Sequence, residues 1–229
     1  MITEPSSPSS LTNLYARGGK RFFDLCVGGL VLIIAGPLMV AIALLIKLED
    51  RAPVFYRQER IGRNGRPFFL TKFRSMVFGA ENKGAGILVE KNDARITRIG
   101  RVLRKLSLDE LTQVFDVLRG DMSIVGPRPG LRYQAELYDR EQRRRLLVRP
   151  GITGWAQIKG RNAITWPERI RLDLEYIDRM SFRRDLAIIF LTIPAVLSGS
   201  DQIADADYWK NRRIEIEESR KSPASDGEA

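Results

Sequence analysis

The longest apolar run of the chain extends from Leu25 to Ile46 and contains no charged residue. A straight helix of these 22 residues would be about 33 Å long, which is enough to cross the hydrocarbon core of a bilayer. Gly36 and Pro37 stand near the middle of the run. Because proline removes a backbone hydrogen bond and bends a helix, the pattern predicts a break at this point.

Basic residues flank both ends of this run. They are Arg17, Lys20 and Arg21 before it, and Lys47, Arg51, Arg57 and Arg60 after it. The positive-inside rule places such flanks on the cytoplasmic side of a membrane. A straight span satisfies the rule at one end only, whereas a re-entrant helix that enters and leaves by the same face satisfies it at both. On hydropathy and charge alone, both arrangements stay open.

Two strand-like segments follow, at residues 53–56 and 67–73. Between them lies Arg63-Asn64-Gly65, which is typical of a hairpin turn. Alternation with a period of two places Lys72 and Arg74 on one face of this β-hairpin.

Helical periodicity is strong over residues 95–106, where apolar residues lie opposite a row of arginines and lysines. Such a helix suits an anionic membrane surface, and a core helix with a solvated basic face is the alternative. A second apolar stripe over residues 108–118 predicts another helix, which ends at Gly120.

Glycine and proline divide the rest of the chain. Residues 79–94 and 150–162 are interpreted as loops, and Gly126-Pro127-Arg128-Pro129-Gly130 as a rigid turn that can hold a cis proline. Helices are expected over residues 131–148 and from Thr165 onward, with proline in the first turn of the latter.

These patterns predict an α+β fold that is mostly helical, with a β-hairpin and several interfacial amphipathic helices. The expected organisation is a flexible N-terminal tail (1–16), a membrane segment (17–48), one folded domain (49–198) and a polar C-terminal tail (199–229). The apolar stretch 186–197 is too short to span a bilayer and belongs at the interface or in the core.

Composition narrows the chemistry. The 229 residues include 38 Lys and Arg against 28 Asp and Glu, a net charge of +10 that favours a polyanionic partner: nucleic acid, anionic lipid or a phosphorylated substrate. The absence of histidine excludes a Ser-His-Asp triad, and one cysteine, Cys26, excludes an internal disulfide framework. An enzyme of this composition relies on carboxylates, lysine, arginine or a hard metal ion.

Asp109 and Glu110, at the start of the second predicted helix, are the candidate acidic pair. They allow two interpretations. In one, Ser107 and Glu110 form a capping box. In the other, free N–H groups at the helix start, with Arg104 and Lys105 one turn upstream, favour a phosphate and keep Asp109 ionised as a nucleophile.

At this point the chain resembles the bacterial sugar transferases, specifically the small monotopic phosphoglycosyl transferases. The resemblance extends from Lys20 to about Leu197 and rests on six blocks in a fixed order. The blocks are Lys20-Arg-Phe-Phe-Asp24, Gln58-Glu-Arg-Ile-Gly62, Lys72-Phe-Arg-Ser-Met76, Leu106-Ser-Leu-Asp-Glu-Leu111, Gly120-Asp-Met-Ser-Ile-Val-Gly-Pro-Arg-Pro129 and Pro150-Gly-Ile-Thr-Gly-Trp-Ala-Gln157.

The resemblance implies transfer of a sugar 1-phosphate from a UDP-sugar to undecaprenyl phosphate with release of UMP, the first membrane step of polysaccharide or glycoprotein glycan assembly. It assigns catalysis to Asp109 and Glu110, with Asp109 as the covalent nucleophile. It also implies Mg²⁺, which we place at Asp109 and Glu110, consistent with an oxygen-only site in a chain without histidine.

Further site residues follow from the same resemblance. Lys72 and Arg104 are expected to bind substrate phosphate and Arg128 to line the nucleotide side, while Gln157 and Arg161 are weaker candidates for the donor. Each of these cations has a solvated surface residue as its ordinary alternative.

The family's re-entrant helix implies a monotopic protein on the cytoplasmic face of the bacterial inner membrane, with membrane lipids, glycan-extending glycosyltransferases and a second copy as expected partners. Family members break this helix at a Ser-Pro pair, where the present chain has Gly36-Pro37.

The non-enzymatic alternative is a membrane-tethered module that binds nucleic acid or lipid. Against nucleic-acid binding, no aromatic residues for base stacking lie between its basic residues. The sequence does not identify the sugar.

Overall fold

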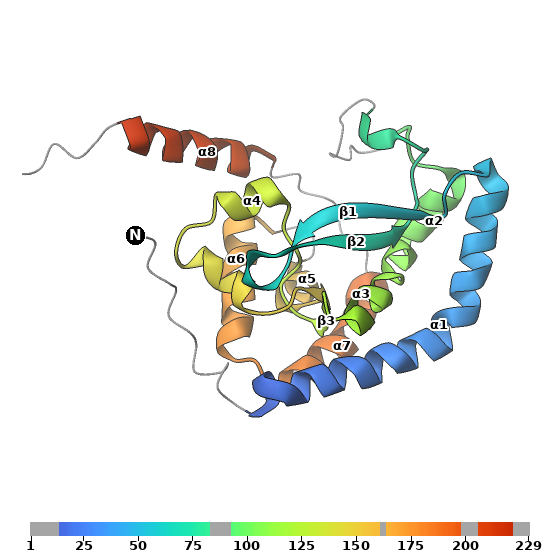
Figure 1. The fold of residues 1–229 in the computed structure, drawn as a ribbon, viewed down its shortest axis with the longest axis horizontal. Helices are drawn as coiled ribbons and strands as arrows, with labels where there is room; N and C mark the ends of the chain where they lie inside the picture. The colour runs from blue at the N-terminus through green and yellow to red at the C-terminus, as the bar shows by residue number, and fades with distance from the viewer. Residues whose placement is uncertain (1–13, 83–92, 161–163, 198–205, 222–229) are drawn as a thin grey trace, which may run out of the picture.

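The computed structural model describes residues 14–82, 93–160, 164–197 and 206–221, and it is mostly helical (Figure 1). The strands are β1 (Phe55–Ile61), β2 (Pro67–Phe73), β3 (Ser123–Val125) and β4 (Gly151–Thr153). The longer helices are α1 (Lys20–Asp50), α6 (Trp166–Asp178), α7 (Phe182–Leu197) and α8 (Ala206–Lys221). The shorter ones are α2 (Arg98–Lys105), α3 (Gln113–Arg119), α4 (Arg132–Glu136) and α5 (Trp155–Gly160). The predicted helical α+β class is therefore confirmed.

The predicted hairpin is confirmed, and its first strand is longer than expected. Strands β1 and β2 pair antiparallel with Tyr56 opposite Lys72 and Gln58 opposite Leu70. Asn64 and Gly65, with φ of 58° and 72°, take the left-handed conformation that closes the turn. A second small sheet, in which β3 and β4 run parallel, was not predicted.

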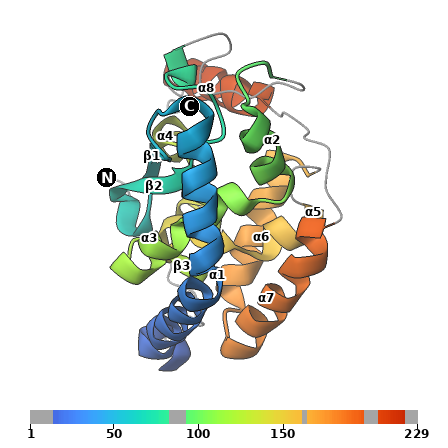
Figure 2. The same ribbon diagram turned by 90° about the vertical axis from the view of Figure 1, so that its right-hand side faces the viewer.

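Helix α1 bends around the body of the protein, along its lower edge and then up one side (Figures 1 and 2). It is the only described helix long and apolar enough to cross a membrane, and 17% of its most apolar stretch is buried. Pro37 lies inside it. The bend agrees with the predicted break, and the low burial distinguishes α1 from the core helix of a soluble protein.

Both ends of α1 are attached to the same folded body by buried or half-buried polar contacts. At its start, Asp24 accepts hydrogen bonds from Ser123 Oγ (2.9 Å) and the Ile124 amide (3.0 Å) next to β3. At its end, Asp50 forms a two-pronged ion pair with Arg74 (2.5 and 2.7 Å). Arg74, predicted to share a hairpin face with Lys72, therefore anchors α1.

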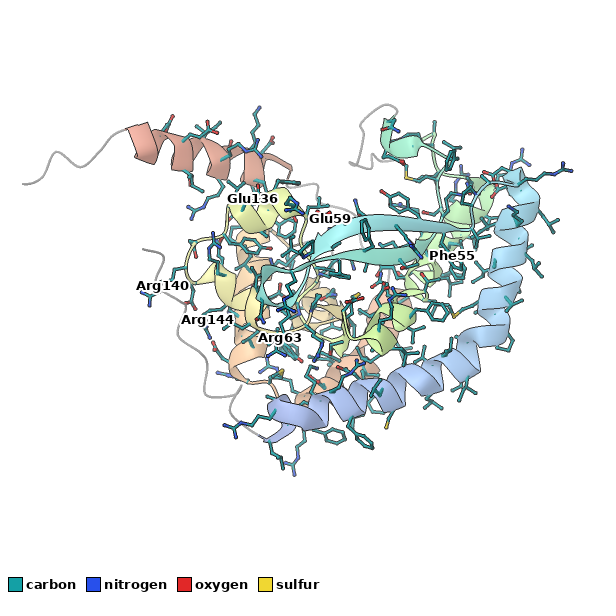
Figure 3. All side chains as sticks on the ribbon, in the orientation of Figure 1. Phe55, Glu59, Arg63, Glu136, Arg140 and Arg144 are labelled. Atoms are coloured by element: carbon teal, nitrogen blue, oxygen red, sulfur yellow. The ribbon has the colours of Figure 1, made fainter. Side chains whose placement is uncertain are left out.

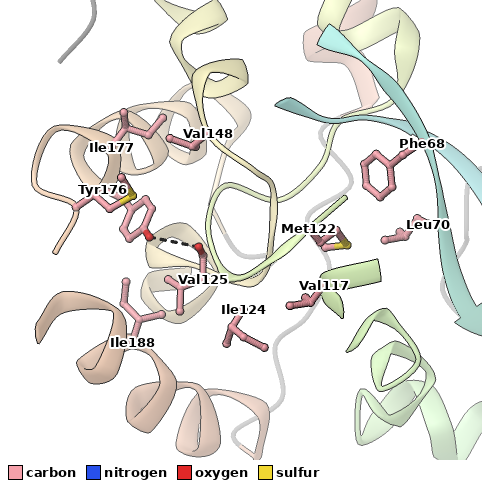
Figure 4. Close-up of a cluster of buried hydrophobic side chains, with 11 residues drawn as sticks. Phe68, Leu70, Val117, Met122, Ile124, Val125, Val148, Tyr176, Ile177 and Ile188 are labelled. Carbon is pink, nitrogen blue, oxygen red and sulfur yellow. Dashed lines mark hydrogen bonds between the residues drawn. The ribbon is translucent and has the colours of Figure 1, made fainter. Parts of the chain in front are cut away.

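A central hydrophobic cluster joins the hairpin to the helices (Figure 4). Phe68 and Leu70 of β2 pack in it with Val117 and Met122, and the Tyr176 hydroxyl donates to the Val125 carbonyl at 3.3 Å. Beside it, the buried Asp116 of α3 accepts hydrogen bonds from the Thr71 amide (2.9 Å) and hydroxyl (3.2 Å). These contacts fix β2 against α3, and α3 begins shortly after the turn that carries Asp109.

Several predicted helices are shorter than the apolar pattern implied. Helix α2 starts only after Thr97, whose hydroxyl accepts from the Gly100 amide (2.9 Å). The predicted helix 108–118 is divided into a 3-10 turn, Leu108–Glu110, and α3. Over 131–148 only α4 and a 3-10 segment, Gln142–Leu147, are present, and α4 is capped at Leu137.

Two further expectations are corrected. The peptide bonds of the 126–130 turn are trans, as are all those described. The polar C-terminal segment contains the helix α8. Its Trp209 is buried and packs against the rings of Tyr138 and Trp166, which removes apolar ring surface from water.

Residues 1–13 of the predicted N-terminal tail and residues 83–92 of the 79–94 loop lie outside the described residues. Tyr15, which the prediction assigned to the tail, begins a π-helix (Tyr15–Gly19), and its hydroxyl donates to Asp185 at 2.6 Å.

Gly100 is predicted to be indispensable for packing α2. A Cβ at this position would lie 1.9 Å from the Ser75 carbonyl oxygen, so Gly100→Ala forces the helix away from the strand end. We expect a loss of roughly 1–3 kcal/mol, measured as a fall of several degrees in Tm of the detergent-solubilised protein.

The matched control is Gly29→Ala, because a Cβ at Gly29 meets no described atom within 4 Å. That substitution should leave Tm unchanged or raise it slightly through helix propensity. An unchanged Tm in Gly100→Ala would contradict the tight packing of α2.

Candidate active site

Asp109 and Glu110 lie on the 3-10 turn between α2 and α3. Ser107, just before it, takes a left-handed conformation (φ 55°) and its side chain makes no capping hydrogen bond to the turn. The capping-box interpretation is therefore wrong. A capping box needs an N-cap residue with an extended backbone, whereas Ser107 is left-handed and precedes only a short 3-10 turn, with α3 beginning at Gln113.

Glu110 instead holds two cations from distant parts of the chain. Its Oε1 accepts from Lys72 Nζ and from Arg128 Nη2, both at 2.6 Å, and its Oε2 accepts from Arg128 Nη1 at 3.2 Å. Burial alone would raise the pKa of Glu110, but the charges of Arg128 and Lys72 outweigh it and hold the pKa well below its ordinary value. Glu110 is therefore ionised and bound on both sides.

Asp109 is more deeply placed, with 7% of its surface exposed. Burial raises its pKa, which the nearby charges of Lys72, Arg104 and Arg128 partly oppose. Within the described residues no group donates a hydrogen bond to its carboxylate. A carboxylate surrounded by cations and not yet hydrogen-bonded is available to an incoming electrophile.

The structure thus brings together four of the predicted residues: Asp109, Glu110, Lys72 and Arg128. Arg104 is half-buried and close enough to lower the pKa of Asp109. The three cations come from β2, α2 and the 126–130 turn, so no single segment forms the site.

Gln157 and Arg161 are not brought to this group by the described contacts. Gln157, on α5, donates to the Ile152 carbonyl at 3.3 Å, and its Oε1 is buried with no described partner. Arg161 lies outside the described residues.

Arg60 is a site residue that the sequence analysis did not single out. Burial and the charge of Arg128 lower its pKa to about 10, whereas the charge of Glu110 opposes the shift. Two observations pointed to it: the Gln58–Gly62 block contains it, and alternation along β1 places it on the same face as Tyr56, which pairs with Lys72.

The acidic pair fits a magnesium ion only in part. No three His, Cys, Asp or Glu side chains of the described residues gather closely enough to form a metal centre by themselves. Mg²⁺ is commonly held by one or two carboxylates together with substrate phosphates. Asp109 fits that mode, whereas the oxygens of Glu110 are already bound by Lys72 and Arg128.

Comparison with known proteins places this sequence in a family. Residues 15–199 match the model of the family described as bacterial sugar transferase. The uncharacterized sugar transferase EpsL of Bacillus subtilis is 45% identical over 178 residues, which cover 78% of this chain and 87% of that protein. The exopolysaccharide production protein ExoY of Rhizobium meliloti is 42% identical over 195 residues, which cover 77% and 84%.

A longer relative carries a more specific name. The UDP-N-acetylgalactosamine-undecaprenyl-phosphate N-acetylgalactosaminephosphotransferase of Aeromonas hydrophila is 44% identical over 186 residues, covering 79% of this chain and 44% of that protein. Other relatives are named as undecaprenyl-phosphate glucose and galactose phosphotransferases. By its match over most of its length, the chain belongs to the bacterial sugar transferase family.

Proposed function

We propose that this chain transfers a sugar 1-phosphate from a UDP-sugar to undecaprenyl phosphate and releases UMP, at the first membrane step of exopolysaccharide assembly. The names of its relatives support this class of reaction. They differ in the sugar that they specify, so the donor sugar of this chain is left open.

The observation that carries the proposal is the charge of the site. The site contains four cations, which are Lys72, Arg60, Arg104 and Arg128, and each of them affects the pKa of another site residue or has its own pKa shifted by one. Against the two carboxylates of Asp109 and Glu110, they leave a formal excess of two positive charges. The diphosphate of a UDP-sugar carries two negative charges at neutral pH. A buried site with this excess favours such a donor, and it stabilises the charge spread over the phosphoryl oxygens during transfer.

In the proposed first step, an Asp109 carboxylate oxygen attacks the β-phosphorus of the donor. The bond from that phosphorus to the bridging oxygen breaks, and UMP leaves with the bonding electrons. In the second step an oxygen of undecaprenyl phosphate attacks the same phosphorus, which releases the sugar diphosphate lipid and restores the Asp109 carboxylate. Both steps conserve charge and need no external oxidant or base.

Glu110 has a different role in this scheme. Because it already holds Lys72 and Arg128 within 2.6 Å of Oε1, it keeps both cations oriented before the donor arrives. Their remaining N–H groups are then in position to bind phosphate oxygens. Mg²⁺, held by Asp109 and donor phosphates, would supply additional neutralisation of phosphate charge.

The proposed membrane arrangement is a re-entrant helix, which the attachment of α1 supports. Its two ends contact one folded body through Asp24 and Asp50, as expected if both ends lie on the same side of a bilayer. The basic α2 with exposed Val102, and the exposed Leu106 directly after it, support an interfacial, cytoplasmic-face location. An enzyme is favoured over the nucleic-acid or lipid-binding module, because Lys72 is ion-paired with Glu110 and Arg60 binds the Pro129 carbonyl, so neither cation is displayed on an open basic surface.

Asp109→Asn is predicted to abolish turnover. The assay measures UMP release from purified protein with undecaprenyl phosphate, Mg²⁺ and a panel of UDP-sugars, with an EDTA arm that tests the metal. Loss of the nucleophile should lower kcat by about 10⁴-fold or more, since removal of a covalent nucleophile has effects of that size.

Asp121→Asn is the matched control, because Asp121 lies at the far end of α3, half-exposed and beside Arg119. It should retain turnover. Activity that persists in Asp109→Asn would remove the covalent mechanism, and activity unaffected by EDTA would remove the metal.

Lys72→Met is predicted to lower kcat/KM for the donor about 10²-fold, the usual effect of removing one preorganised electrostatic donor. Arg57→Met is its control, since Arg57 is an exposed cation one residue from the partner of Lys72 on β1. Equal losses in the two variants would indicate a general effect of hairpin charge and contradict a specific contact of Lys72 with the substrate.

A further inference from the structure

The backbone carbonyls of the turn that carries Arg128 are hydrogen-bonded by donors from other segments of the chain. Each of four consecutive carbonyls accepts a hydrogen bond from another segment. The pairs are Gly151 N to Pro127 O (2.9 Å), Arg145 Nη2 to Arg128 O (3.1 Å), Arg60 Nη1 to Pro129 O (3.2 Å) and Ile61 N to Gly130 O (3.0 Å).

This arrangement fixes the backbone on which Arg128 stands. Pro127 and Pro129 have fixed φ angles and no N–H group, so the turn cannot stabilise itself with its own donors there. The orientation of its peptide planes is then set by what binds the carbonyls. Two of those donors are side chains, and they bind the carbonyls of Arg128 itself and of the residue after it.

Arg145 is built into the protein interior to make this contact. It is 5% exposed, and it forms an ion pair with Asp173 of α6 at 2.8 Å and a hydrogen bond to the Tyr138 hydroxyl. Asp173 is 1% exposed. A buried ion pair of this kind adds little net stability compared with apolar residues of the same size. Its structural consequence here is that the Arg145 guanidinium is held where it binds the Arg128 carbonyl.

The neighbouring arginine in the same basic run behaves differently. Arg144 (Figure 3) is also largely buried, with 12% of its side chain exposed, but it pairs with Glu141 and Asp178, whose side chains are 61% and 46% exposed. None of its described hydrogen bonds reaches the 126–130 turn. The sequence does not distinguish the three arginines 143–145, whereas the fold turns one of them inward to the active-site turn.

We propose that Arg145 is a positioning residue for Arg128, acting through the Arg128 carbonyl, and that Arg60 acts in the same way through the Pro129 carbonyl. This inference rests on the proposed function in taking a nucleoside diphosphate as the ligand of Arg128. Held in this way, the Arg128 guanidinium is aligned on Glu110 before the donor binds, so no binding energy is needed to order it.

A double-mutant cycle on UDP affinity tests the proposal, with UDP as the probe and neither acceptor nor turnover required. Arg145→Met should weaken UDP binding about tenfold in the wild-type background and less than about twofold in the Arg128→Ala background, because its effect passes through Arg128. Arg144→Met, the matched control, should change UDP affinity less than about twofold in either background.

Equal weakening by Arg145→Met in both backgrounds would overturn the proposal, since a general structural defect does not depend on Arg128. If Arg145→Met fails to fold because Asp173 is left unpaired, Arg145→Lys takes its place in the same cycle, because lysine keeps a positive charge beside Asp173 and lacks the guanidinium fork that also reaches the Arg128 carbonyl. A wild-type protein that binds UDP but releases no UMP with any donor would overturn the proposed function and leave this cycle intact.

Hydrogen exchange tests the same contacts without any ligand. The amides of Ile61 and Gly151 are bonded to the turn, so they should exchange faster in Arg145→Met and Arg60→Met and at the wild-type rate in Arg144→Met. Unchanged exchange at both amides in the first two variants would overturn the proposal even if the wild type does not bind UDP.

Discussion

Glu110 is a carboxylate largely withdrawn from water, and an ion in that environment is stable only when charged partners replace its hydration. Its partners, Lys72 and Arg128, come from the hairpin and from the proline-bounded turn, while Glu110 itself stands between α2 and α3. Any one of these segments out of place leaves a buried charge unpaired. The paired charges therefore determine how the segments meet, and Asp109, the next residue, is placed by the same requirement.

The position of this centre also depends on α1. The helix is anchored at Asp24 beside β3 and at Asp50 beside β2, so the apolar bend and the charged site belong to one body. A lipid phosphate cannot leave the membrane surface without exposing its chain to water. The proposed reaction therefore needs Asp109 close to that surface, and the proposed re-entrant course of α1, attached to the body at both ends, is consistent with this need.

The sequence predicted those parts of the fold that depend on local signals. Asn64-Gly65 and period-two alternation gave the hairpin, and the acidic pair, Lys72 and Arg128 came together as the motifs implied. The break before α3 was missed because apolar spacing continues through Leu108, while a left-handed Ser107 has no sequence signature. Helix α8 was missed because its composition is polar and its order comes from Trp209 packing on distant rings. Arg145 could not be separated from its neighbours, because only tertiary structure decides which arginine reaches the 126–130 turn.

The proposed two-step mechanism requires a sugar phosphate bound covalently to Asp109. The decisive measurement is a single-turnover reaction of the protein with its UDP-sugar and Mg²⁺ in the absence of undecaprenyl phosphate, followed by mass spectrometry of the peptide that contains Asp109. The account predicts a burst of about one UMP per active chain and a sugar phosphate attached to Asp109, both before any acceptor is added. UMP release that requires undecaprenyl phosphate, with an unmodified Asp109 peptide, would contradict it.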